Sequence, residues 1–169
     1  MTHHTEEHKK VLIAWLNDAY SMEKGLVPVL ENHAKDAKNH PQVQSRIQQH
    51  IEATKRHADL VKGRIEALGG DVSNVKAGVG SLMGSLQSVT TGAFKDELVK
   101  NALSDFASEN FEIASYKALI TAAQEVGDQE TVRVCQEILH DEEDMAHWLD
   151  QNLPMVTKET MRQKAPEMK

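Results

Sequence analysis

Residues 109–116 read Glu109-Asn-Phe-Glu112-Ile-Ala-Ser-Tyr116, and they lie in the middle of a long segment with helical periodicity. Side chains three or four positions apart share one face of an α-helix, so Glu109, Glu112 and Tyr116 point in similar directions. That direction is the apolar stripe of the segment, which would bury both carboxylates. Burial of an ionised carboxylate is costly unless a charge partner or a metal ion compensates it.

Three other segments with helical periodicity show the same anomaly. Glu23 lies on the apolar stripe of the first segment, and Glu142 lies on that of the last. In the second segment, His50, Thr54 and His57 follow the i, i+4, i+7 spacing and share one face. Carboxylates and imidazoles that point inward from four helices are typical of a two-metal site in a helical bundle.

The apolar periodicity predicts four helices, at about residues 6–37, 41–68, 94–126 and 129–152. Pro41 suits the first turn of the second helix, and the glycines at 69–70 end that helix. Pro154 is expected to stop the fourth helix, because proline lacks the N–H that a helix interior needs. We therefore expect one domain over residues 1–153 and a C-terminal tail over 154–169.

Residues 69–92 differ in composition from the helical segments. They contain six glycines and few long polar side chains, which indicates a long connection, although residues 79–86 could form a short helix within it. A simple up-down bundle needs no such connection. A ferritin-like bundle does, because its second and third helices run parallel. The predicted fold class is all-α, a ferritin-like four-helix bundle with a long Gly/Ser-rich crossover between helices two and three.

Composition narrows the possible functions. The chain has 169 residues, 4% aromatic residues and a formal net charge of −7. Few aromatic residues favour helices over strands, and the negative charge argues against a nucleic-acid partner. We therefore rank a DNA-protecting protein last among the hypotheses. No apolar run approaches the roughly 20 residues that span a bilayer, and no signal-peptide core is visible. The lone Cys135 cannot form an internal disulfide, so a cytoplasmic location is expected.

Four segments resemble the ferritin-like YciE/YciF-type bacterial stress proteins. They are Asp18-Ala-Tyr-Ser-Met-Glu23-Lys, His50-Ile-Glu-Ala-Thr54-Lys-Arg-His57, the 109–116 string, and Ile138-Leu-His-Asp-Glu142-Glu. The match extends from about residue 6 to 153, and the 109–116 string is its most specific part. The resemblance implies a four-helix ferritin-like fold, a homodimer and a rubrerythrin-like two-metal site, in proteins tied to stress responses.

The chain departs from the usual ferritin-like pattern at two positions. That pattern has Glu-x-x-His on helices two and four, whereas this chain has Thr54-x-x-His57 and Glu142-x-x-Met145. The departure predicts a site that is poor in ligands on one side. Water, Glu109 or His50 would have to complete it.

The expected site combines the inward polar residues with a tyrosine. The predicted metal ligands are Glu23, His50, His57, Glu109, Glu112 and Glu142, and Tyr116 is the predicted catalytic residue beside them. Oxygen and imidazole ligands suit two divalent ions, iron or manganese more than zinc. The acids that flank Glu142, namely Asp141, Glu143 and Asp144, are expected to face solvent.

The sequence leaves two hypotheses about the function open. The first is a di-metal protein of the stress response that reduces peroxide or oxidises Fe(II), with peroxide or oxygen as the small-molecule substrate. The alternative is a non-enzymatic helical stress or interaction protein with a degenerate metal site. Retention of metal by the folded protein separates the two.

Overall fold

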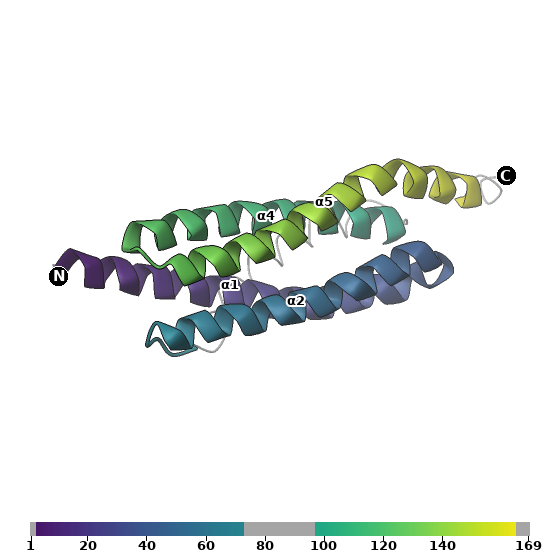
Figure 1. Ribbon diagram of the computed structural model, residues 1–169. Helices are drawn as coiled ribbons and strands as arrows, with labels where there is room; N and C mark the ends of the chain where they lie inside the picture. Colours follow the sequence, from purple (N-terminus) through teal and green to yellow (C-terminus); the bar gives the residue numbers. More distant parts are fainter. Residues whose placement is uncertain (1–2, 73–96, 165–169) are drawn as a thin grey trace.

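The computed structural model describes residues 3–72 and 97–164, and these residues are almost entirely helical. Its elements are α1 (His3–Asp36), the short 3-10 helix η1 (Ala37–Asn39), α2 (Pro41–Ala67), α4 (Glu97–Val126) and α5 (Gln129–Lys164). Figure 1 shows the four long helices lying alongside one another as a bundle.

Two antiparallel hairpins make up the bundle. Helix α1 packs mainly against α2, and α4 packs mainly against α5, with α1 against α4 and α2 against α5 closing the arrangement. Helices α2 and α4 run in the same direction along the bundle (Figure 1). Parallel helices cannot be joined by a tight turn, so the predicted ferritin-like topology is confirmed. Most of the crossover, including the short helix expected at 79–86, lies outside the described residues.

The local signals at the helix ends act as the sequence predicts. Pro41 occupies the first turn of α2. Gly69 and Gly127 have φ values of +78° and +76°, the left-handed conformation that closes a helix and that glycine adopts without a Cβ penalty. Asp128 then accepts a hydrogen bond from the backbone N–H of Thr131 at 3.2 Å, which caps the start of α5.

The prediction that Pro154 ends the fourth helix is wrong. Helix α5 continues through Pro154 to Lys164, so most of the expected tail belongs to it. The added turns bury Val156 and Thr160, and His40 contacts Glu159 across the bundle at 3.1 Å. Proline costs a helix interior about 3 kcal/mol, and burial of these turns offsets that cost.

Two further boundaries differ in smaller ways. Helix α1 begins at His3, three residues before the expected start. The predicted third helix would begin at residue 94, and residues 94–96 lie outside the described residues. The short η1 separates α1 from α2, so the chain turns within a few residues and the hairpin stays tight.

Apolar side chains fill both ends of the bundle, but its middle is polar. Helix α4 shows this most clearly, because the residues that it buries before Tyr116 are Ser104, Asp105, Ser108, Glu109 and Glu112. Phe106, an apolar residue in the same stretch, is only partly buried. Buried polar groups lower the stability of a helical bundle unless they are compensated. The polar side chains in the middle of this bundle therefore need an explanation other than packing.

Candidate metal centre

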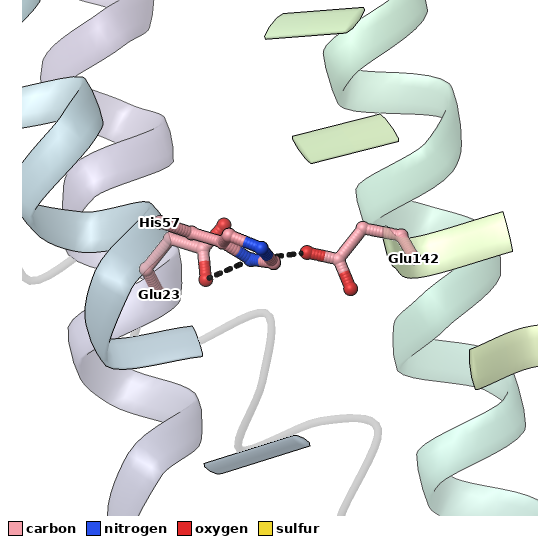
Figure 2. A group of neighbouring side chains, drawn as sticks. All are labelled: Glu23, His57 and Glu142. Carbon is pink, nitrogen blue, oxygen red and sulfur yellow. Dashed lines mark ion pairs between the residues drawn. The ribbon is translucent and has the colours of Figure 1, made fainter. Parts of the chain in front are cut away.

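Three fully buried side chains from three helices meet in the middle of the bundle. Figure 2 shows Glu23 of α1, His57 of α2 and Glu142 of α5 pointing toward one another. Nδ1 of His57 lies 2.9 Å from Oε1 of Glu142 and 3.8 Å from Oε2 of Glu23. One imidazole nitrogen and two carboxylate oxygens within this range can bind a single metal ion.

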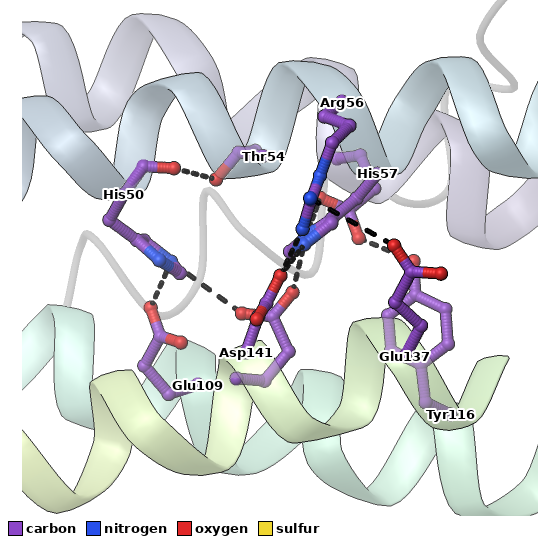
Figure 3. A network of polar contacts seen from close by, with 10 residues as sticks. His50, Thr54, Arg56, His57, Glu109, Tyr116, Glu137 and Asp141 are labelled. Carbon is purple, nitrogen blue, oxygen red and sulfur yellow. Dashed lines mark hydrogen bonds and ion pairs between the residues drawn. The ribbon is translucent and has the colours of Figure 1, made fainter. Parts of the chain in front are cut away.

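A second group lies next to the first and includes the same glutamate. Nε2 of His50 lies 3.0 Å from Oε1 of Glu109 and 3.6 Å from Oε2 of Glu142 (Figure 3). The ligand atoms of this group also lie within 4.8 Å of one another. Glu142 therefore faces one histidine with each of its oxygens. A carboxylate shared in this way is the element that bridges two ions in a di-metal site.

The donor atoms of the two groups are short of hydrogen-bond partners. The atoms of these groups that lack a partner are Glu23 Oε2, His57 Nδ1, Glu109 Oε2 and both carboxylate oxygens of Glu142. Oε2 of Glu112, which lies outside the two groups, also lacks one. His57 Nδ1 is close to Glu142 Oε1, but the angles do not make a hydrogen bond. Unpaired buried acceptors cost about 1–3 kcal/mol each, and more when charged. Cations between these atoms would satisfy them, so the donor set fits a pair of metal ions.

Burial gives these groups unusual proton affinities. Burial, together with the nearby Glu142 carboxylate, raises the pKa of Glu23 to about 8. The same causes hold the pKa values of Glu109 and Glu112 well above the usual glutamate range. Burial opposes the charged form of His57, but Glu142 and Glu23 outweigh it and raise its pKa to about 9. In the absence of metal, the centre therefore retains protons at neutral pH.

The pKa of His50 shifts in the opposite direction. Burial is the main cause that lowers its pKa, and His57 and Arg46 add to the effect. A neutral imidazole is the form that binds a metal ion, so His50 is ready to act as a ligand. His50 and Glu109 thus supply a nitrogen and an oxygen on the side where the ferritin-like pattern is incomplete.

The two departures from that pattern have clear structural consequences. The Thr54 hydroxyl donates to the backbone carbonyl of His50 at 3.0 Å, one turn back in the same helix. Met145 is fully buried and contributes only a thioether. Neither residue supplies an oxygen or imidazole ligand to the two groups.

Tyr116 and Glu112 complete the set that the sequence predicts. The Tyr116 hydroxyl donates a hydrogen bond to Oε1 of Glu23, and burial raises the tyrosine pKa well above its usual value. The phenol is therefore a fixed proton donor that orients Glu23. Glu112 is buried in the same region, but its oxygens belong to neither of the two close groups.

Asp141 contacts the centre, although the sequence analysis placed it in solvent. Its Oδ2 lies 3.1 Å from Nε2 of His57 and also accepts a hydrogen bond from Arg56 (Figure 3). The prediction for Asp141 is thus wrong, whereas Glu143 and Asp144 are exposed as expected. Asp141 lies off the apolar stripe, so periodicity gave no signal. The only indication in the sequence of a contact between Asp141 and His57 is that each adjoins a residue of the same cluster, Glu142 and Arg56 respectively.

Asp141 should set the orientation of the His57 ring. Its carboxylate holds Nε2–H and thereby presents Nδ1 to the centre, as a carboxylate behind a metal-bound histidine does. We expect Asp141→Asn to weaken metal binding by about 10–100-fold. Competition with a chelator of known affinity measures the change. Asp144→Asn is the matched control on the same helix, and equal affinities in the two variants would contradict the role of Asp141.

Comparison with known proteins places the fold in a family. Residues 7–162 match the model of a family described as a domain of unknown function, DUF892. The chain belongs to the DUF892 family. Among solved structures, the chain is similar to a protein from Xanthomonas campestris pv. campestris. The two are 30% identical, and their structures match with a TM-score of 0.81 over 94% of this chain and 98% of that chain.

Two further solved structures relate the DUF892 fold to stress proteins and ferritins. The E. coli stress protein YciF is 21% identical, with a TM-score of 0.78 over 89% of this chain and 97% of its own. A bacterioferritin from Desulfovibrio desulfuricans is 20% identical, with a TM-score of 0.75 over 91% of this chain and 84% of its own. The predicted YciE/YciF-type family and ferritin-like fold are both confirmed.

The described helices were also compared with the requirements of a membrane span. None of them, over residues 3–72 and 97–164, combines the length and the apolar character that crossing a bilayer requires.

Proposed function

We propose that this DUF892 protein holds two divalent metal ions, iron or manganese, in the middle of its bundle. The observation that carries the proposal is the position of Glu142 between two ligand groups, with one carboxylate oxygen toward each histidine. Glu23 and His57 would hold one ion, and His50 and Glu109 the other. The bacterioferritin that shares the fold has a diiron site, which supports this assignment.

The chemistry that a pair of such ions supplies when bound is two-electron exchange with peroxide or oxygen. The protein side chains provide the surroundings. Glu23, His57 and Glu142 are fully buried, which keeps bulk water from the reacting groups. The Tyr116 hydroxyl holds Glu23 in place and can deliver a proton at Glu23 Oε1. Peroxide reduction or Fe(II) oxidation during stress is the activity that we propose, in line with the likeness to a stress protein.

The first test is metal content. The purified protein is stripped with a chelator, reloaded separately with Fe(II) and Mn(II), desalted and analysed for bound metal. We expect close to two ions per chain, and an increase in melting temperature that tracks loading, because a ligand of the folded state stabilises it. No retained metal with either ion would reject the proposal. Peroxide consumption by the loaded protein then tests the activity.

A metal-free structural role is the second candidate, and one observation favours it. The raised pKa values of Glu23, Glu109 and Glu112 mean that protons can neutralise the buried carboxyls without any ion. In that case the polar centre would be a hydrogen-bonded core of an interaction protein. Its melting temperature would not respond to Fe(II) or Mn(II). A homodimer and a cytoplasmic location stay predictions, and light scattering on the purified protein tests the dimer.

A further inference from the structure

A second buried polar pair lies outside the two ligand groups, toward the end of the bundle where α1 joins α2. His33 of α1 contacts Asp105 of α4, with 2.7 Å between Nδ1 and Oδ1. The two residues are only 8% and 3% exposed. Neither residue is among the metal ligands that the sequence predicts. A histidine and a carboxyl group buried at this depth need a compensating reason.

Asp105 has one oxygen more than His33 can satisfy. Its Oδ2 is buried and has no hydrogen-bond partner. Both Asp105 and His33 line a small cavity of about 20 Å³ between the four helices. A cavity of this size holds one water molecule or one ion of similar radius. Asp105, which carries the unpaired oxygen, therefore lines a space for a single small ligand.

Two asparagines line the same cavity and add oxygen donors. Asn101 uses its Nδ2 to bond Asp36, at 2.9 Å, and Asn152 uses its Nδ2 to bond the backbone carbonyl of Trp148, at 2.8 Å. Each amide is thereby fixed, and its Oδ1 is the atom left to accept from or coordinate a ligand. Imidazole nitrogen with carboxylate and amide oxygens is a donor set for Mn²⁺ or Fe²⁺.

The rest of the cavity wall is mostly apolar. Val43, Leu98 and Val156 are among the apolar side chains that surround the polar atoms. Attraction between a carboxylate and a divalent ion is much stronger in such a dry environment than in water. Two atoms 2.7 Å apart, such as His33 Nδ1 and Asp105 Oδ1, subtend about 80° at an ion that lies about 2.1 Å from each. That angle is near the right angle of octahedral coordination.

The pair is close to the proposed two-metal centre. Asp105 precedes Glu109 by four residues on α4, which is about 6 Å along the helix. The residue that α4 buries between them is Ser108, so no large apolar side chain of this helix separates the pair from the centre. The buried face of α4 is thus polar over the stretch from Asp105 to Glu112.

We propose that His33 and Asp105, with the amide oxygens of Asn101 and Asn152, form a third, mononuclear site for divalent manganese or iron. The ion binds Nδ1 and a carboxylate oxygen of Asp105 from the cavity side, where the two atoms are neighbouring ligands. The proton shared by Nδ1 and Oδ1 is released to solvent, and the imidazole keeps its remaining proton on Nε2. This site shares no residue with the two-metal centre, so it can be present or absent independently of the proposed function.

Anomalous diffraction from crystals soaked in a large molar excess of MnCl₂ tests the site directly. The expected result is a peak between His33 and Asp105 in addition to two at the centre. Peaks at the centre with none at His33 would overturn the third site. A peak at His33 with none at the centre would support the third site and reject the two-metal proposal. No peak at either place would reject both.

Mn(II) titration of variants supplies the second measurement. Asp105→Asn and His33→Gln should each bind one ion fewer per chain than the wild type and retain the two ions of the centre. His40→Gln is the matched control, because His40 also pairs with a carboxylate at this end of the bundle, Glu159 at 3.1 Å. The control should bind as many ions as the wild type. Circular dichroism identifies a variant that fails to fold, and an unchanged stoichiometry in either folded variant would overturn the site.

Discussion

Replacing Glu142 with Gln should remove both metal ions at the two-metal centre, from about two per chain to near zero. Glu142 faces His57 with one oxygen, at 2.9 Å, and His50 with the other, at 3.6 Å. An amide is a poor bridge, since its nitrogen is a donor and cannot coordinate. Substitution of this one carboxylate therefore disrupts both ion sites of the two-metal centre.

A comparison of single variants separates a shared ligand from an ordinary one. Glu23→Gln alters only the group that contains His57, so it should retain the ion held by His50 and Glu109. Glu143→Gln, an adjacent glutamate on the exposed face of α5, should retain both ions and is the matched control. Metal content after desalting is the readout. If Glu142→Gln lost no more metal than Glu23→Gln, a bridging role for Glu142 would be excluded.

Loss of metal in Glu142→Gln should not come from unfolding. The Glu142 carboxyl repels the other buried glutamates of the centre and raises their pKa values. Removal of that repulsion offsets the loss of its contact with His57. We therefore expect the chelated variant to melt at the temperature of the chelated wild type or above it. A variant that melts far below would mean that Glu142 mainly holds the bundle together through His50 and His57.

The metal-free protein should lose stability as the pH rises from about 5 to 9. The pKa of Glu23 is near 4.5 in an unfolded chain and about 8 in the fold. Between these values the folded state binds the proton more tightly, so its advantage is complete below pH 4.5 and is lost as the pH passes 8. The raised pKa of His57, about 9, acts in the same direction.

The expected loss in the free energy of unfolding is large. A pKa raised from 4.5 to about 8 corresponds to a change of about 5 kcal/mol in the free energy of unfolding, at about 1.4 kcal/mol per pKa unit. This energy belongs to Glu23 together with the buried groups that it interacts with, Glu142 and His57. Urea unfolding of the chelated protein across this pH range measures it. Glu23→Gln is the control and should show a shallower dependence. A chelated wild type of constant stability from pH 5 to 9 would contradict the raised pKa values.

Metal should reverse the sign of the pH dependence. The ligands must be deprotonated to bind, so protons compete with the ions and affinity rises with pH. In the presence of excess Mn(II), stability should increase from pH 5 toward pH 8 as the ions replace the protons of Glu23, Glu109 and His57. Opposite slopes with and without metal would identify these carboxyls and this imidazole as ligands.

The periodicity of the sequence determined which side of each helix faces inward. Glu23, His50, His57, Glu109, Glu112 and Glu142 were all predicted on inner faces and are all buried. A spacing of 3.6 residues per turn fixes the direction of a side chain about its own helix, so this much needs no tertiary information. The glycine-rich segment likewise indicated the parallel arrangement of α2 and α4.

Other features depended on the helices being assembled. Periodicity gives no height of one helix relative to another, so it could not show that Glu142 lies between His50 and His57, or that Asp105 meets His33. Asp141 lies off the stripe of its helix and reaches His57 only because α2 packs beside α5. Helix α5 passes Pro154 because burial of Val156 outweighs a local penalty. Local rules gave the direction of each side chain, and packing between helices decided which of them meet.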